Sequence, residues 1–336
     1  MVNVIDAYNR SFSQRLALNR AILDNQYWVL PVDNKGHENF VPVGRAQKTG
    51  DHCGSWSHVS VCKNVEGHEG IHVDGLDCTG KVVVRHNHLW CNKSSCPVCF
   101  IRGYSSREAR SIGGRFVEAE KRGLGKPEHI SVSVPVADRD LPEPVLRLKC
   151  REALIDRGVV GGCMIFHGYR IDRNRRALVW SPHYHSLAIV GNGGFERCRG
   201  CVHGRDDCRG CDGFKGREVR GYARDGYLVK VHDARKTVVG TAHYQLNHAT
   251  VRLGIRRFHI VTWFGSVSYC KFKSEPLKVE SVCPACSEEM VKSFHVGKRH
   301  IVKDIGSRDY VPLFVDDEFD NNGEANYVDA VGGKFG

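Results

Sequence analysis

The chain has 336 residues, 41% of them hydrophobic, so it can bury a sizeable core and is not disordered throughout. No stretch approaches the roughly 18–20 consecutive apolar residues that cross a membrane. The start, MVNVIDAYNRSFSQ, lacks the basic head and apolar block of a signal peptide. We therefore expect a cytoplasmic protein without a membrane partner.

The formal net charge is +11, and it is unevenly distributed. Residues 311–336 hold six acidic residues against one lysine, a net of −5, so the rest carries +16. A basic body suits a polyanion such as nucleic acid or an anionic membrane surface. A basic protein with no such partner is the alternative, because net charge alone indicates partners only weakly.

The predicted elements change character along the chain. Helical spacing is present over 10–26 and 103–122, on either side of a Cys-, His- and Gly-rich stretch typical of a small metal-stabilised module. From residue 128 the order is strand, helix, two hairpin strands joined by the turn RNRR, a Gly/Cys-rich interruption, strand, helix and strand. The corresponding ranges are 128–136, 145–158, 161–172, 176–191, 192–226, 226–233, 238–254 and 256–273.

This order predicts an α+β fold, a central antiparallel sheet with helices on one face, accompanied by small zinc-binding modules. The expected domain division is an N-terminal helical segment, a Cys/His-rich module with its helix, a central domain interrupted by a four-cysteine zinc insertion, a possible C-terminal zinc finger or ribbon, and a flexible acidic tail. The corresponding ranges are 1–50, 51–125, 126–275 with the insertion at 192–226, 276–310 and 311–336.

A His-Tyr-His motif lies within the second hairpin strand. His183 and His185 are two residues apart, so in a strand their imidazoles lie side by side and suit a divalent metal. His167, on the preceding strand, is a candidate third ligand if the hairpin pairs across RNRR. The alternative for all three is a structural histidine in a strand.

Tyr244 lies on the helix predicted over 238–254, one turn before His248. Tyrosine is a poor nucleophile at neutral pH unless a metal, base or cation helps it to lose its proton. His248 is a candidate for that assistance. A packed helix tyrosine is the alternative.

Three motifs in this order resemble the HUH endonuclease superfamily, particularly the rolling-circle replication initiator (Rep) proteins of archaeal plasmids and viruses. They are HISVSVP (129–135), His183-Tyr184-His185 and the Tyr244 helix, preceded by CNKSSCPVC and SSREARSIGGRF. The resemblance covers about 90–275. The sequence differs from the family's pattern at two points. The first motif has a serine where the family often has threonine, and the tyrosine helix has Asn247 and His248 where relatives often have a lysine or a second tyrosine. The second difference favours an enzyme with a single nucleophile.

The resemblance implies an HUH/Rep-type nuclease domain that nicks single-stranded origin DNA. The tyrosine would form a 5′-phosphotyrosine intermediate, leave a free 3′-OH and allow rejoining, with Mg²⁺ or Mn²⁺ held by the histidines. It implies no small-molecule substrate. No G-x4-G-K-[ST] motif occurs in the sequence, so we expect a host helicase and polymerase as partners. Alternatives are a non-catalytic multi-zinc nucleic-acid-binding regulator and an HUH transposase or relaxase.

Fifteen cysteines, many in close pairs with histidines nearby, favour zinc in a reducing compartment. The C-x2-C pairs of the insertion predict a closed structural site at Cys198, Cys201, Cys208 and Cys211. A second site has three ligands, Cys91, Cys96 and Cys99, and needs a fourth from Cys78, His86 or His88. The spacing of Cys53, Cys62, His68 and His72 is finger-like and predicts a further possible site. Cys283 and Cys286, with His295 and His300 beyond them, are a possible finger or ribbon, or residues that close no site.

Arginines cluster on either side of the predicted site. We expect Arg173, Arg175 and Arg176, with Arg170 beside them, and Arg256 and Arg257, with Arg252, to bind DNA phosphates. Trp180 or Trp263 could stack on bases. The alternatives are a solvated face for the arginines and core packing for the tryptophans.

Overall fold

The computed structural model describes most of the chain between residues 32 and 329. The described residues are 32–33, 37, 39–45, 53, 56–62, 64–73, 76–192, 220–222, 224–232, 236–255, 258–278, 281–296, 299–303, 310–313 and 325–329. The helix predicted over 10–26, the four cysteines of the insertion, Arg256, Arg257 and most of the acidic tail lie outside these residues.

The chain divides into two compact units. The larger comprises Leu23–Thr49 and Asn92–Leu277, and the smaller comprises Met1–Ile22, Gly50–Cys91 and Lys278–Gly336. This division differs from the predicted ranges, because 51–125 is shared between the units and 276–310 joins the unit of residues 50–91. The reason is long-range strand pairing: β14 (Val291–Val296) pairs with β3 (Trp56–Val61).

A seven-stranded sheet forms the centre of the larger unit. Its order is β10-β11-β7-β9-β8-β13, with every neighbour along this path antiparallel, and β1 pairs in parallel with β9. The predicted α+β class with an antiparallel sheet is therefore confirmed. The strands are β1 (Val32–Asp33), β7 (Glu128–Ser133), β8 (Val159–Asp172), β9 (Ala177–Val190), β10 (Arg220–Tyr222), β11 (Leu228–His232) and β13 (Val261–Gly265).

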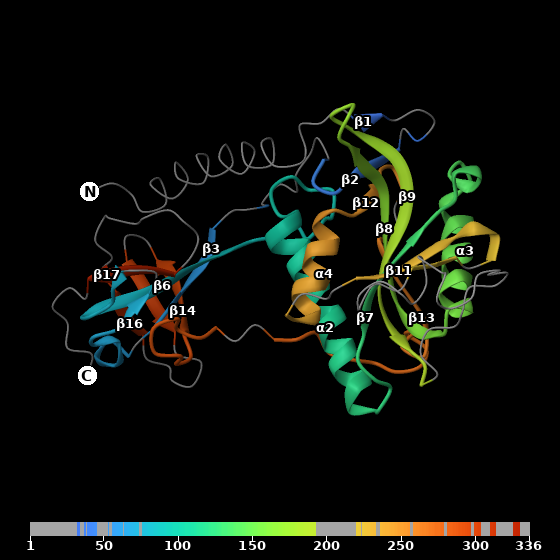
Figure 1. The fold of residues 1–336 in the computed structure, drawn as a ribbon. Helices are drawn as coiled ribbons and strands as arrows, with labels where there is room; N and C mark the ends of the chain where they lie inside the picture. Colours follow the sequence, from blue (N-terminus) through green and yellow to red (C-terminus); the bar gives the residue numbers. More distant parts are fainter. Residues whose placement is uncertain are drawn as a thin grey trace. The chain divides into compact units, whose positions relative to one another are not determined.

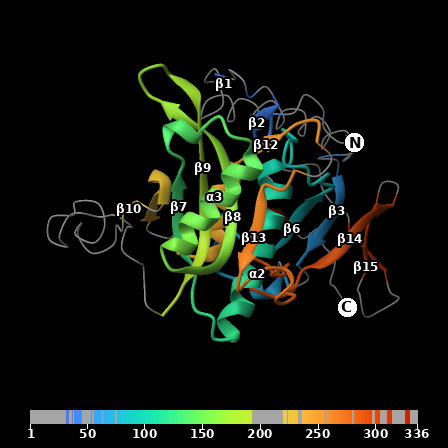
Figure 2. The same ribbon diagram turned by 90° about the vertical axis from the view of Figure 1, so that its right-hand side faces the viewer.

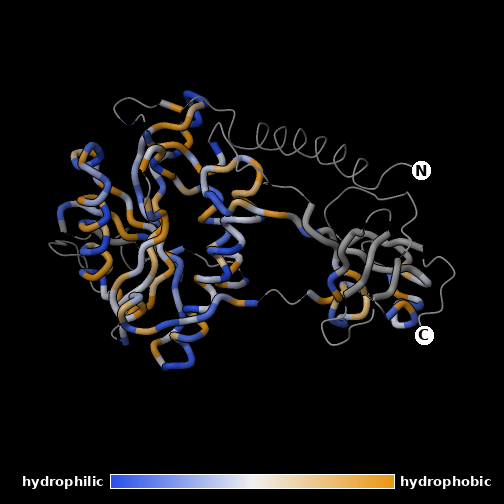
Figure 3. The backbone as a smooth tube through the Cα atoms, turned by 180° about the vertical axis from the view of Figure 1, so that it is seen from behind, coloured by the Kyte–Doolittle hydropathy of each residue, from blue (hydrophilic) through white to orange (hydrophobic). Residues whose placement is uncertain are grey.

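Helices cover both faces of this sheet, which corrects the prediction of helices on one face (Figures 1 and 2). On one face, α3 (Glu143–Asp156) packs against Phe166 and Tyr184. On the other, α2 (Ser106–Lys121) and α4 (Val238–Asn247) pack against Ile165 and Leu187. The central strands contain many hydrophobic residues (Figure 3), and they bury apolar side chains on both faces, so both faces need a cover of helices.

The hairpin of β8 and β9 has the predicted pairing. Asp172 lies opposite Ala177, and its carboxylate accepts hydrogen bonds from the backbone N–H groups of Asn174 and Arg175 at 2.9 and 3.1 Å. This Asx-type turn fixes the register of both strands. The position of His167 relative to the His-Tyr-His motif follows from that register.

Two elements are shorter than predicted. The helix expected to end at Gly254 ends at Asn247, because Thr250–Arg252 forms the strand β12 and pairs with β2 (Phe40–Pro42). The β-branched Thr250 and Val251 favour that extended conformation. The strand expected over 256–273 is restricted to β13 and is followed by turns.

The smaller unit contains a six-stranded antiparallel sheet, ordered β16-β15-β14-β3-β6-β17, and the two-stranded pair β4-β5. The remaining strands are β4 (His72–Val73), β5 (Leu76–Asp77), β6 (Lys81–His88), β15 (Arg299–Lys303), β16 (Tyr310–Leu313) and β17 (Ala325–Asp329). Among the described residues of the chain, no helix has the length and apolar character required to cross a membrane.

Candidate active site

Three histidines meet on the face of the large sheet that α4 covers. His183 and His185 are two residues apart on β9, and His167 on β8 lies directly opposite His183. One ring nitrogen of each lies within 4.8 Å of those of the other two, so the group could hold a metal ion. The predicted grouping of His167 with the motif is therefore present in the fold.

A bulge beside this group shapes the hairpin. His167 pairs with His183, but Tyr169 pairs with Trp180, so Gly168 faces two residues, one of them Pro182. Proline cannot donate to a strand ladder and is tolerated at such a bulge. The N–H of Gly168 instead donates to Thr250 Oγ1 at 2.7 Å. A Cβ at position 168 would lie 2.5 Å from the Trp180 ring, which leaves room only for glycine.

Each of the three imidazoles has one nitrogen occupied by a neighbour. His183 Nδ1 donates to the carbonyl oxygen of Ser181 at 2.8 Å, and His185 Nδ1 lies 3.1 Å from His129 Nε2. The His167 ring bonds to the backbone of Gln245, whereas its Nε2 is buried without a hydrogen-bond partner. The free nitrogens are therefore the Nε2 atoms, as expected of oriented metal ligands.

Burial lowers the pKa of all three histidines well below the usual value. Desolvation is the main cause, and a neighbouring imidazole adds to it: His183 for His167, His185 for His183 and His167 for His185. The rings are therefore neutral at neutral pH, the state that a metal ligand requires. Three neutral rings and a buried, unpaired Nε2 fit a divalent cation.

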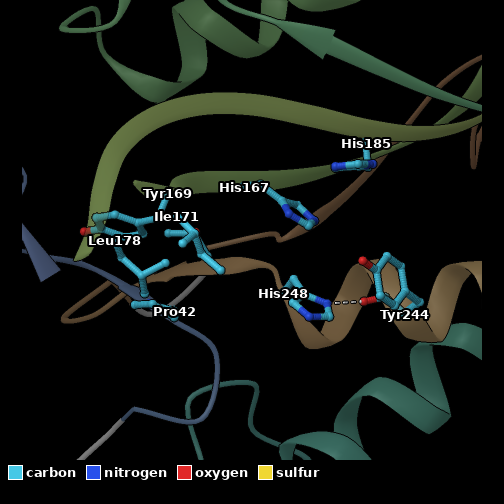
Figure 4. A pocket seen from close by; sticks show the side chains of 9 residues that line it. Pro42, His167, Tyr169, Ile171, Leu178, His185, Tyr244 and His248 are labelled. Atoms are coloured by element: carbon cyan, nitrogen blue, oxygen red, sulfur yellow. Dashed lines mark hydrogen bonds between the residues drawn. The ribbon is translucent and has the colours of Figure 1, made fainter. Parts of the chain in front are cut away.

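Tyr244 on α4, and His248 directly after its last residue, project toward His167 and His185 (Figure 4). Thr237 caps the helix by accepting a bond from the Gly240 N–H at 2.9 Å, and Ala242 and Leu246 bury its opposite face. Tyr244 is 42% exposed. His248 Nδ1 donates to the Tyr244 carbonyl oxygen at 2.8 Å, and the two ring centroids are 4.7 Å apart.

Two of the three histidines, His167 and His185, line one pocket of about 220 Å³ together with Tyr244. The sheet supplies one wall and α4 the other (Figure 4). The pocket continues past the histidines along an apolar surface. Its lining residues are Pro42, His167, Tyr169, Ile171, Leu178, His185, Tyr244, His248 and Thr250.

A second row of polar side chains continues the same sheet face onto β7 and β11. His129 and Ser131 are buried on β7, and Ser131 Oγ lies 2.7 Å from His232 Nε2 on β11. Ser133, two residues further along β7, faces His183. None of these four side chains was predicted as a site residue, although polar residues at alternate positions of HISVS are a detectable signal.

Arg170 lies beside the histidines. Its Nη2 donates to Ser133 Oγ at 2.7 Å, and its Nε lies 3.4 Å from His183 Nδ1. Within the described parts of the chain, no carboxylate pairs with Arg170. Its charge is available to an anion beside the histidines.

The other predicted DNA-binding side chains have different surroundings. Arg173, Arg175 and Arg176 are exposed at the tip of the hairpin, and Arg175 Nε lies 3.6 Å from Asp172. Trp180 donates to the Arg139 carbonyl oxygen at 2.9 Å and packs against the core, and Trp263 packs against Phe116 and Arg115. The tryptophans therefore follow the core-packing alternative.

A cluster of three cysteines and one histidine lies inside the smaller unit. Cys62, His68, Cys283 and Cys286 bring their ligand atoms within 4.8 Å of one another and could hold zinc. Cys283 Sγ lies 3.3 Å from His68 Nε2, and Cys62 Sγ lies 3.5 Å from Cys286 Sγ. Burial raises the pKa of the Cys62 and Cys283 thiols.

The cysteine groups differ from those expected from sequence. His72 is exposed on β4 and belongs to no metal-binding group among the described residues. Cys53 joins Cys91, Cys96 and Cys99 as the fourth ligand of a second group that could hold zinc, in place of Cys78, His86 or His88. The finger-like spacing grouped Cys53 and His72 with Cys62 and His68. In the structure Cys53 lies with Cys91, Cys96 and Cys99, and Cys62 and His68 lie with Cys283 and Cys286, which are distant in sequence.

The chain matches no protein-family model, and no curated protein or solved structure matches it significantly. The function is therefore inferred from the site alone.

Proposed function

We propose that the larger unit is an HUH-type, metal-dependent endonuclease that nicks single-stranded origin DNA to start rolling-circle replication. One observation carries the proposal: three neutral histidines lie close enough to hold one metal ion, and two of them, His167 and His185, line the same pocket as the half-exposed Tyr244. A packed helix tyrosine or isolated core histidines would not require this arrangement.

His167, His183 and His185 would hold the cation. Three nitrogen ligands suit Mn²⁺ better than Mg²⁺, which prefers oxygen. When bound, the cation would act as a Lewis acid on a non-bridging phosphate oxygen. Arg170 contributes a fixed positive charge beside the same phosphate.

Tyr244 is the nucleophile in this mechanism. A bond forms between its hydroxyl oxygen and the phosphorus while the bond from phosphorus to O3′ breaks. The tyrosine proton leaves, with His248 as the candidate acceptor beside the ring, and the departing O3′ takes up a proton. The 5′-phosphotyrosine link conserves the phosphoester, so attack by the 3′-OH can rejoin the strand.

Incubation of the full chain with labelled single-stranded DNA of randomised sequence and Mn²⁺ tests the proposal. We expect a covalent adduct stable in denaturing gels, with Tyr244 as the modified residue by mass spectrometry. Tyr244→Phe should abolish it, and Tyr269→Phe, at a residue 66% exposed outside the pocket, should not. An undiminished adduct with Tyr244→Phe, or cleavage by His183→Ala/His185→Ala, would contradict the mechanism.

The zinc-binding groups support a second candidate, a regulator that binds nucleic acid without cutting it. Binding without an adduct under any divalent cation would favour that candidate. A transposase or relaxase would form the same adduct, and the DNA flanking the gene, transposon ends or a small circular replicon, would distinguish it from an initiator.

A further inference from the structure

The pocket beside Tyr244 has an apolar wall that neither a cation nor a phosphate requires. This wall consists of Pro42, Tyr169, Ile171 and Leu178, and Figure 4 shows it on one side of the histidines. Ile171 and Leu178 face each other across the hairpin. The wall is continuous with the space that holds the reacting groups.

The wall is rigid but partly open. The Tyr169 hydroxyl donates to the Phe40 carbonyl oxygen at 2.6 Å, which fixes its ring, and Leu178 is buried. Ile171, in contrast, is 43% exposed. An exposed apolar side chain in a concave site marks a surface that a ligand can cover.

The size of the pocket limits the occupant. About 220 Å³ exceeds the roughly 150 Å³ cavity that accepts benzene, so a planar ring system fits. A DNA strand with its scissile phosphate between the histidines and Tyr244 must place an adjoining nucleotide nearby. We propose that the apolar wall binds the nucleobase of a nucleotide flanking the scissile phosphate, an inference that rests on the proposed function.

Few polar atoms of the wall are available to read the edge of a base. The Tyr169 hydroxyl is engaged with Phe40, and Thr250 Oγ1 already accepts a bond from Gly168. Recognition here therefore depends on apolar contact and shape and tolerates several bases. A base can enter only when unstacked, which agrees with a single-stranded substrate.

Abasic substitution tests this subsite once the nick in a wild-type substrate has been mapped. Each nucleotide flanking the nick is replaced in turn by an abasic analogue, and single-turnover cleavage is measured. We expect one position to show a loss of about tenfold or more. Ile171→Ser should cause a similar loss on intact DNA and no further loss on the abasic strand. Ile155→Ser, at a 52% exposed isoleucine on α3, should leave both rates unchanged.

A second measurement separates folding from recognition. Thermal melting of Ile171→Ser should match the wild type, and binding of uncleaved DNA by Tyr244→Phe should show the same abasic penalty. Normal cleavage of the substrates with an abasic site on either side of the nick would contradict the subsite. So would a loss for Ile171→Ser that adds to the loss caused by the abasic site. Neither result would contradict the proposed nuclease activity. Absence of any wild-type adduct would overturn the proposed function and this subsite with it.

Discussion

His129 Nε2 lies 3.1 Å from His185 Nδ1, and this contact differs from those of the other two candidate ligands. Backbone carbonyls orient His183 and His167, through Ser181 and Gln245. His185 is instead oriented by the imidazole of another histidine. If its Nε2 binds a cation, its Nδ1 carries the proton and donates to His129.

Replacement of His129 should therefore weaken metal binding without touching a ligand. We expect His129→Leu to lower Mn²⁺ affinity about ten- to hundredfold by calorimetry, and His129→Gln, which retains an acceptor, to recover part of it. His243→Leu, at a histidine of α4 that contacts Ile101, is the control. Equal Mn²⁺ affinity in His129→Leu and the wild type, at equal melting temperature, would remove this role.

Arg170 should act on the rate as well as on binding. Arg170→Gln should reduce the slope of log affinity against log salt by about 1, because one phosphate contact is lost. It should also lower single-turnover cleavage by about tenfold or more, since the guanidinium lies beside His183.

Arg175 offers a comparison, because it lies at the exposed tip of the same hairpin. We expect Arg175→Gln to change the salt dependence alone. If both variants alter the cleavage rate equally, Arg170 has no special position at the phosphate.

The smaller unit should depend on zinc. Cys62, Cys283 and Met290 are buried together in this unit, so a metal bound by the Cys62 group would hold the end of β3 and the 281–290 segment together. Cys283→Ser should remove one zinc equivalent, measured by elemental analysis, and increase hydrogen exchange over 56–68 and 281–296. Cys270→Ser, at an exposed cysteine, should do neither. Unchanged zinc content in Cys283→Ser would exclude this site.

Acid stability should depend on Asp138. Its carboxylate accepts bonds from the Tyr227 hydroxyl at 2.6 Å and Lys149 Nζ at 3.0 Å, and both lower its pKa below 3.8, Tyr227 most. The depressed pKa means that the stabilisation is present above about pH 4 and is lost as the pH falls through the folded pKa.

Asp138→Asn should reduce the free energy of unfolding by about 1 kcal/mol at pH 7 and much less at pH 2. Tyr227→Phe should likewise reduce the free energy of unfolding more at pH 7 than at pH 2, because it removes the main hydrogen-bond donor to the Asp138 carboxylate. Denaturant titrations across pH measure both effects. Parallel stability curves for Asp138→Asn and the wild type would contradict this assignment.

The sequence by itself determined the strands and helices whose periodicity is strong. HISVS, the hairpin around RNRR and the helix at 145–158 all correspond to elements of the structure, because alternation and helical spacing reflect local burial. The same hairpin register placed His167 opposite His183. The end of α4 escaped prediction because Thr250–Arg252 pairs with residues 40–42, a contact that no local pattern contains.

Only the tertiary structure decided which side chains share a site. His129 lies beside His185 through the pairing of β7 with β9, and Cys62 meets Cys286 across 224 positions of the chain. Tyr244 likewise shares a pocket with His167 and His185 because α4 packs on that face of the sheet. Local sequence fixes the direction of a strand's side chains, whereas strand pairing and helix packing fix their neighbours, which is why the motif residues could be named from sequence and their partners could not.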